Sequence, residues 1–254
     1  MKTLRIGDSS DDVKLLQRYL TELNYNIGKI DGIFETGTQS AVKQFQSKNK
    51  LTADGIVETT TWTTINNTIK KLSEIQVLFA SDLSDYRKNI VSIKSIIMIK
   101  NAALESKNSK VTITSTIRTP QEQAIAMYNN ESNNNHIAYA DPGRQVIKVY
   151  NDNKTKDKET VINLMVEKIE ELAKTGKLVS RHCVTEEMYK KENIFDISYK
   201  NLPNPKDFTN ALLKNKSISK IITPLGDKSI NYNNDVRISI DTKEPAIHIQ
   251  NKIN

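Results

Sequence analysis

The chain has 254 residues, of which 37% are hydrophobic and 26% charged, and its formal net charge is +7. This composition indicates a soluble globular protein with room for one large domain or two smaller ones. The single cysteine, Cys183, excludes an internal disulfide and a cysteine-rich metal site, so a bound metal would need His, Asp or Glu ligands. Basic and acidic residues alternate without an aromatic-studded basic run, so we expect no nucleic-acid partner despite the positive charge.

The chain contains no stretch that predicts membrane insertion. The N-terminus lacks an apolar segment of signal-peptide length, and the most apolar window, residues 90–99, is short and interrupted by Lys94. We therefore expect a monomer without stable membrane insertion. Such a protein either works inside the cell or leaves it by a route that its sequence does not encode.

Residues 1–70 predict a compact domain of three helices. Apolar residues recur at helical spacing from Val13 to Leu23, and further helices are expected over Thr38–Lys48 and from Thr60. The turn sequence Asp31-Gly32-Ile33-Phe34 is echoed by Asp54-Gly55-Ile56-Val57, and each copy is followed by a Thr and a helix. Asp-Gly suits a tight turn, because Gly accepts positive φ and the Asp side chain can bond the turn amides.

The motifs in this segment are Leu15-Leu16-Gln17, Leu20, Leu23, Tyr25, Gly28, Asp31-Gly32-Ile33-Phe34, Thr38, Ala41-Val42, Phe45-Gln46, Leu51, Asp54-Gly55 and Thr61-Trp62. Together they resemble the peptidoglycan-binding domain found in cell-wall hydrolases. Glu35 and Glu58 stand where that family usually carries glycine, which affects turn geometry but not the core pattern. The resemblance implies that peptidoglycan is a partner of the chain.

Residues 71–254 predict a larger α+β domain with an antiparallel sheet. Helices are expected up to about residue 108, from Thr119-Pro120 through Met127, over Thr160–Lys174 and after Asn204-Pro205, with a polar loop over residues 129–135. Short strands are expected over Val111–Thr116, Leu178–His182, Ile194–Ser198, Ile218–Ile222, Val236–Ile240 and Ala246–Gln250. Helices that come before most of the strands are typical of an α+β domain.

Two histidines lie in contexts that suggest a metal site. A single His on an apolar strand is more often a hydrogen-bonded core residue, and this alternative holds for His182 and His248 taken separately. The motifs that accompany these histidines favour a catalytic role. In chain order they are Ser115-Thr116-Ile117-Arg118 with Gln123, Ser180-Arg181-His182, Phe195-Asp196-Ile197 and Glu244-Pro245-Ala246-Ile247-His248. This series resembles the zinc D-alanyl-D-alanine carboxypeptidases (VanY-like) and the phage L-alanyl-D-glutamate endopeptidases.

The resemblance implies a role for each motif. It makes His182, Asp196 and His248 the ligands of Zn²⁺, Glu244 the catalytic base and Arg118 the clamp for the substrate carbonyl, with Ser115 and Gln123 in contact with substrate. Two imidazoles and one carboxylate leave a coordination position for water, as catalytic zinc sites require.

The spacing departs from the family at two places. Fourteen positions separate His182 from Asp196, where the family has seven; the extra residues are expected to form a longer hairpin tip, with Glu186 or Glu187 as a competing ligand. Glu244 precedes His248 by four positions instead of two or three, which a bulge at Pro245 would absorb, and Asp241 is the reserve candidate for the base. Cys183 follows His182 directly and would face the opposite side of a strand, so a cysteine nucleophile is disfavoured.

These features predict an endolysin-like peptidoglycan hydrolase that cleaves an amide bond with zinc-activated water and reaches the wall after release from the cell. A wall-binding protein without activity and a wall amidase remain as alternatives. The cleaved bond stays open among D-Ala-D-Ala, L-Ala-D-Glu and a cross-bridge.

Overall fold

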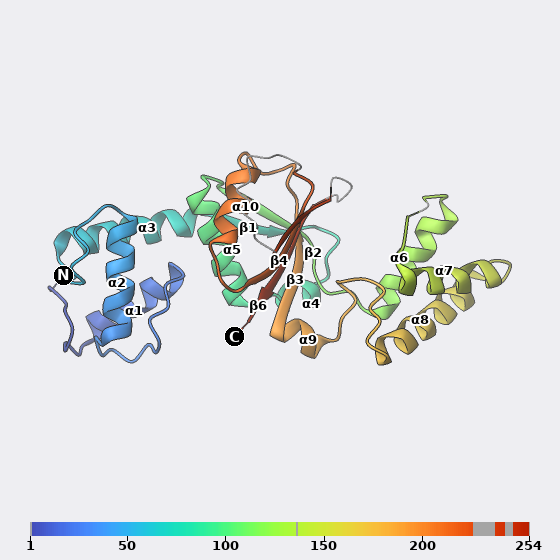
Figure 1. Cartoon of the computed structure of the whole chain (residues 1–254), viewed down its shortest axis with the longest axis horizontal. Helices are drawn as coiled ribbons and strands as arrows, with labels where there is room; N and C mark the ends of the chain where they lie inside the picture. Colours follow the sequence, from blue (N-terminus) through green and yellow to red (C-terminus); the bar gives the residue numbers. More distant parts are fainter. Residues whose placement is uncertain (1, 136, 226–236, 242–245, 254) are drawn as a thin grey trace.

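The computed structural model describes residues 2–135, 137–225, 237–241 and 246–253. Figure 1 shows three bodies in a row: a helical module at the N-terminus, a central sheet covered by helices, and a helical arm on the far side. This arrangement confirms the predicted α+β class.

The N-terminal module consists of α1 (Asp11–Glu22), α2 (Thr36–Lys48) and the first part of α3 (Thr59–Glu74). The hydroxyl of Ser10 accepts a hydrogen bond from the amide of Val13 at 3.3 Å and caps α1. The apolar residues predicted to point inward lie in the core of the module. This core includes Leu4, Val13, Leu16, Leu20, Phe34, Val42, Phe45, Val57, Trp62 and Ile65. Since α3 runs on to Glu74, the proposed domain division at residue 70 lies inside this helix.

Two buried glutamines build the repeated turns of the module. Gln17 Nε2 donates to Asp31 Oδ1 (3.0 Å), the carbonyl of Ile33 (3.0 Å) and Thr38 Oγ1 (3.3 Å), while its Oε1 accepts from the amide of Gly32 (2.8 Å). The second repeat forms the same pattern at Gln46, whose partners are Asp54 Oδ1 (2.9 Å), Ile56 O (2.8 Å), Thr61 Oγ1 (3.3 Å) and Gly55 N (2.9 Å). The echo seen in the sequence is therefore a repeat of hydrogen bonds as well as of turns.

A six-stranded mixed sheet forms the centre of the molecule, in the order β1-β2-β3-β6-β4-β5. Its strands are β1 (Gln76–Phe79), β2 (Lys110–Ser115), β3 (Glu192–Ile197), β4 (Ile218–Thr223), β5 (Ile238–Ile240) and β6 (Ile247–Lys252). The four inner strands are antiparallel as predicted, but β1 pairs with β2, and β5 with β4, in parallel. The predicted antiparallel sheet is thus extended at each edge by one parallel strand.

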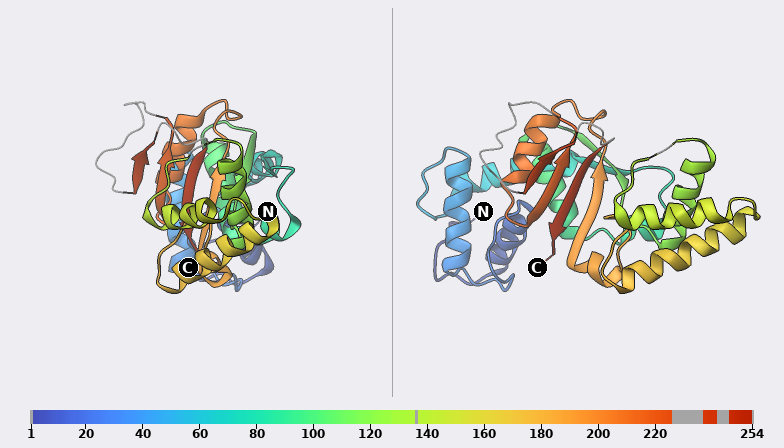
Figure 2. Two further views of the ribbon diagram at one scale, coloured as in Figure 1. Left: turned by 90° about the vertical axis from the view of Figure 1, so that its right-hand side faces the viewer. Right: turned by 45° about the vertical axis from the view of Figure 1, so that its right-hand side comes forward.

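Helices cover one face of this sheet. The helices α5 (Ile93–Glu105) and α10 (Pro205–Leu213) pack on apolar strand residues such as Phe195, Ile197, Ile247 and Ile249 (Figures 1 and 2). Because side chains alternate along a strand, Asp196 and His248 point to the opposite face. The short α4 (Asp85–Asn89) lies between β1 and α5 in the chain.

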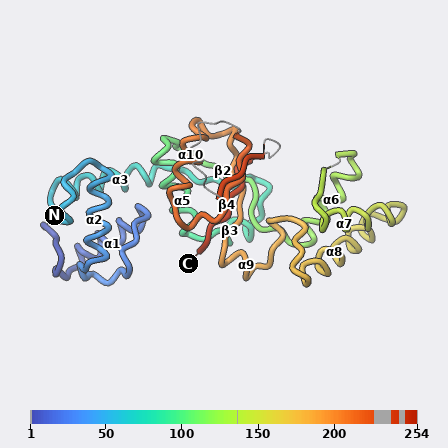
Figure 3. The backbone as a smooth tube through the Cα atoms, in the orientation of Figure 1, coloured from blue at the N-terminus to red at the C-terminus, as the bar shows by residue number. Residues whose placement is uncertain are grey.

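The helical arm comprises α6 (Pro120–Ser132), α7 (Asp141–Asn153) and α8 (Lys158–Lys174) around a core of its own. The chain leaves the sheet after β2, runs through the arm and returns by α9 (Glu186–Lys191) into β3 (Figure 3). A capping box between Thr119 and Glu122 starts α6. This helix continues through residues 129–132, which were expected in a loop.

The predicted strand over Leu178–His182 is wrong. The hydroxyl of Ser180 accepts from the amide of His182 (3.3 Å), and its carbonyl accepts from the amide of Cys183 (3.1 Å). These local bonds fold the segment into a turn, and no strand of the described chain pairs with it. Cys183 is buried with the core of the arm, and burial raises the pKa of its thiol to about 11, which opposes a nucleophilic role.

The module contacts the sheet domain through polar groups. Lys48 Nζ pairs with Glu105 Oε2 at 2.7 Å, and Asn101 Nδ2 donates to the carbonyl of Glu22 at 2.8 Å. Across the described segments, we find no helix with the length and apolar character needed to span a bilayer.

Candidate metal centre

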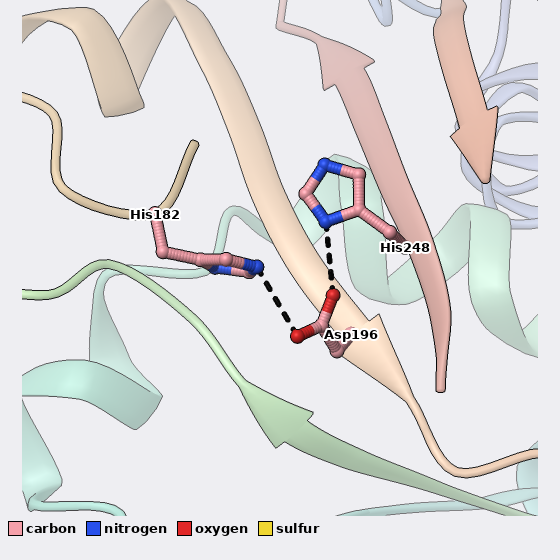
Figure 4. Close-up of side chains that lie close together, drawn as sticks. All are labelled: His182, Asp196 and His248. Carbon is pink, nitrogen blue, oxygen red and sulfur yellow. Dashed lines mark hydrogen bonds and ion pairs between the residues drawn. The ribbon is translucent and has the colours of Figure 1, made fainter. Parts of the chain in front are cut away.

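His182, Asp196 and His248 meet on the open face of the sheet. One potential ligand atom from each lies within 4.8 Å of the other two. Asp196 stands between the imidazoles (Figure 4): its Oδ1 is 3.0 Å from His248 Nδ1, and its Oδ2 is 3.2 Å from His182 Nε2. The structure thus brings together the three residues predicted as ligands.

Strand pairing explains the position of two of them. Asp196 of β3 is the direct partner of His248 of β6 in the antiparallel register. Directly opposed residues point to the same face with their Cβ atoms about 5 Å apart, so the carboxylate meets the imidazole without any unusual backbone.

A turn, not a strand, positions His182. Its carbonyl accepts a hydrogen bond from the amide of Arg118 at 2.8 Å, and its Nδ1 lies 2.8 Å from the carbonyl of Thr116. A carbonyl can only accept, so Nδ1 carries the proton, and in the neutral imidazole Nε2 presents its lone pair to Asp196. An imidazole held in one tautomer by a carbonyl behind it is the usual arrangement of a histidine that binds a metal.

The free lone pair of His182 is the feature that fits a metal ion. Nε2 is buried and makes no hydrogen bond with the described residues, because the nearby Oδ2 of Asp196 lies outside hydrogen-bond geometry. A buried polar atom without a partner costs free energy, about 1–3 kcal/mol. A divalent cation held between Nε2 and the carboxylate would remove this cost, so the donor set suits zinc.

A residue outside the candidate ligand set also contacts His248. Its Nδ1 faces Asp196, while its Nε2 is 3.4 Å from the side-chain amide of Gln250, two residues along β6. If Nδ1 binds a metal, Nε2 must carry the proton, and a half-turn of the Gln250 amide presents Oε1 to accept it.

The electrostatics of Asp196 favour its charged form. Burial acts to raise the pKa of this carboxyl, but the neighbouring imidazoles of His182 and His248 outweigh it and hold the pKa well below the ordinary value of 3.8. The carboxylate is therefore ionised at neutral pH and available as an anionic ligand.

The extra residues between His182 and Asp196 form α9 and not the expected hairpin tip. Thr185 caps this helix, whose exposed glutamates pair with its lysines: Glu186 with Lys190 at 2.5 Å and Glu187 with Lys191 at 2.7 Å. Neither glutamate belongs to the ligand group found among the described residues. The helix takes up the additional length and still delivers Asp196 to the site.

The three residues predicted to contact substrate lie between the end of β2 and the first turn of α6. A bulge between Ile113 and Ser115 makes Ser115 the partner of Asp196, which turns its side chain to the same face. Arg118 Nη1 donates to Oε1 of the buried Gln123 at 3.4 Å, so the structure joins these two residues. Of the two candidate bases, Glu244 lies outside the described residues. Asp241 is described at the end of β5, where its amide donates to the carbonyl of Thr223 at 3.0 Å.

Sequence reasoning did not single out Thr116, Gln250 or Arg87 for a role of their own. Thr116 bonds His182 through its carbonyl and donates its hydroxyl to the carbonyl of Arg87 at 2.9 Å. Gln250 could have been found from its place two residues after His248 on one strand face, whereas nothing local to the short α4 indicates that Arg87 lies near this site.

Residues 9–65 match the family model described as a putative peptidoglycan binding domain. The N-terminal module is a peptidoglycan-binding domain. The match covers the helices α1 and α2 and the start of α3, and it contains both glutamine-centred repeats.

Other similarities cover a minor part of the chain. The carboxy-terminal processing protease CtpB of Bacillus subtilis (strain 168) is 37% identical over 68 residues, which are 27% of this chain and 14% of that protein. The SleB N-terminal domain is 33% identical over 26% of this chain and 90% of its own, with a TM-score of 0.26. A fused Zn-dependent amidase/peptidase/peptidoglycan-binding domain-containing protein from Clostridium acetobutylicum ATCC 824 is 37% identical over 26% of this chain and 29% of its own, with a TM-score of 0.25. The chain spans less than a fifth of the length of the curated relatives that it matches.

Proposed function

We propose that the chain is a zinc-dependent peptidoglycan hydrolase that cleaves an amide bond in the peptide part of the cell wall. The observation that carries the proposal is the convergence of His182, Asp196 and His248, with a buried lone pair of His182 that has no hydrogen-bond partner among the described residues. The peptidoglycan-binding module supports the choice of substrate, because it would hold the enzyme on the polymer that it cuts.

Each residue of the site has a separate role in the proposed reaction. Zinc held by these ligands would supply a Lewis acid and a bound water whose pKa is lowered toward about 7. Thr116 fixes the tautomer of His182. With its amide turned so that Oε1 faces His248 Nε2, Gln250 would fix the tautomer of His248. Both imidazoles are then oriented before substrate arrives, which lowers the cost of assembling the transition state.

Arg118 and a carboxylate complete the chemistry. The guanidinium of Arg118 would donate to the scissile carbonyl oxygen as negative charge develops there, with Gln123 holding its Nη1. The resemblance assigns proton transfer to Glu244, which would take a proton from the attacking water and return it to the leaving amine. Asp241 is the reserve for this role. The carboxy-terminal domain is on this proposal a VanY-like peptidase.

The test is hydrolysis of purified sacculi by the full chain at neutral pH with zinc supplied. We expect new amino groups to appear, and mass spectrometry of the fragments to place them within the stem peptide or its cross-bridge. Fragments with intact stem peptides released from the sugar would identify an amidase instead. If no amino groups appear while the protein still sediments with the sacculi, the chain is a wall-binding protein without this activity.

A further inference from the structure

Three buried polar atoms make no hydrogen bond in the described part of the chain: His182 Nε2, Arg87 Nε and Tyr189 Oη. Such atoms are rare in folded proteins and call for an explanation. The proposed metal centre would account for His182. Arg87 lies beside it, since its backbone carbonyl accepts from the hydroxyl of Thr116, whose own carbonyl faces His182 Nδ1.

The guanidinium of Arg87 is buried but poorly paired. Its side chain is 13% exposed, and its nearest polar contacts are Ser115 Oγ at 3.5 Å and Glu122 Oε1 at 3.7 Å. Both distances exceed the roughly 2.7–2.9 Å of a charge-assisted hydrogen bond. The other oxygen of Glu122 is already engaged in the capping box with Thr119. Among the described residues, Arg87 Nε therefore has no acceptor, and the two terminal nitrogens make only long contacts.

Ser115 links this guanidinium to the metal centre. Its Oγ is 3.5 Å from Arg87 Nη2, and Ser115 is the register partner of Asp196. Directly opposed residues of an antiparallel pair point to the same face. Burial lowers the pKa of Arg87, the charge of Glu122 raises it and the charge of Arg118 lowers it.

We propose that Arg87, with Ser115 as a further donor, binds a free carboxylate of the peptide substrate next to the bond that is cut. The inference rests on the proposed function. A planar guanidinium fork matches a carboxylate in a bidentate geometry that a lysine cannot reproduce. The stem peptide offers two such groups, the C-terminal carboxylate and the free carboxylate of its D-glutamate.

The test compares a synthetic stem pentapeptide with two analogues, each carrying a carboxamide in place of one of these carboxylates. Binding is measured by calorimetry on the metal-free full chain, where nothing is hydrolysed, and kcat/KM is measured with zinc present. We expect the wild type to prefer the acid over one analogue by about 10- to 100-fold, the value of a hydrogen bond to a charged group. The analogue that loses affinity identifies which carboxylate is bound.

Three variants separate this role from a structural one. Arg87→Gln should weaken binding of the acid to the level of that analogue and leave the analogue unchanged, while Arg87→Lys should recover part of the preference. Ser115→Ala should reduce the preference several-fold with Arg87 intact, which keeps the test open if Arg87→Gln does not fold. The matched control is Arg144→Gln on α7, whose exposed guanidinium pairs with Asp141 and should change nothing.

Two results would overturn the inference: a wild type that does not distinguish acid from either carboxamide, or an Arg87→Gln protein that keeps full discrimination and bound zinc. Hydrolysis of all three peptides at equal rates would remove the carboxylate site and leave the hydrolase intact. Selective binding of the acid without any hydrolysis would support the carboxylate site and contradict the proposed hydrolase.

Discussion

The side chain of Gln250 offers a sensitive test of how His248 is held. Gln250→Met removes the amide that lies 3.4 Å from His248 Nε2 and keeps a side chain of similar length. With the amide turned, Gln250 Oε1 accepts from His248 Nε2 and favours the tautomer with a lone pair on Nδ1. The variant loses this acceptor. Loss of such an outer partner lowers metal affinity by about 10- to 100-fold, or roughly 1.4–2.8 kcal/mol.

The assay is competition for zinc between the metal-free full chain and a chelator of known affinity. Gln250→Glu retains an acceptor at the same place and should bind zinc at least as tightly as the wild type. The control is Gln145→Met, because Gln145 lies on the exposed side of α7 and bonds only Asp141 among the contacts described. Cobalt spectra report the ligand geometry independently of activity. Equal zinc affinity of Gln250→Met and the wild type would refute the assignment of Gln250 as a positioning residue.

The remaining predictions concern the ligands, the base and the module. His182→Ala and His248→Ala should each lose zinc and hydrolysis together, as metal analysis and amine release will show; a variant that keeps full zinc content would remove that residue from the ligand set. Glu244→Ala should bind zinc normally and lose turnover, and turnover that persists would shift the base to Asp241. The module should lose stability in acid: backbone hydrogen bonds from Ile33 and Ile56, followed by those of Gln17 and Gln46, lower the pKa of Asp31 and Asp54 from 3.8. The contribution of these carboxylates to stability is complete above pH 3.8 and disappears as the pH falls through the lowered pKa. In urea unfolding, the free energy of unfolding of Asp31→Asn/Asp54→Asn should therefore decline less in acid than that of the wild type. Equal declines in both proteins would contradict this assignment.

The features predicted best from the sequence are those that local residue patterns encode. The helices of the module follow from apolar spacing, and its repeated Asp-Gly turns were visible before the structure. The hydrogen bonds of Gln17 and Gln46 were not, because their partners lie up to 21 positions away and only the folded chain brings them together.

The sheet was predicted less completely. The strand β1 has only four residues, and its sequence Gln-Val-Leu-Phe does not alternate between polar and apolar side chains, although the burial of these residues does. The helices α7 and α9 did carry signals that were not used: Pro142 after Asp141 starts α7, and Thr185 followed by two glutamates and two lysines is typical of a short capped helix. Ser180 explains the strand wrongly assigned near His182, since a hydroxyl that bonds the backbone competes with strand pairing.

The candidate ligands were found from motif order, although the spacing between His182 and Asp196 departed from the family. Their convergence depends on contacts at long range: the register of β3 with β6 and the bond from His182 to Thr116, 66 positions away. No local pattern encodes either contact, which is why Thr116 and Arg87 emerged only from the structure, whereas the spacing of Gln250 from His248 on one strand was a usable signal.

Titration of zinc into the metal-free full chain tests the central claim most directly. We predict one tightly bound ion per chain in the wild type and none in Asp196→Ala, which removes the carboxylate that both imidazoles face. A wild type that binds no zinc, or an Asp196→Ala protein that binds it as tightly, would contradict the proposed metal centre.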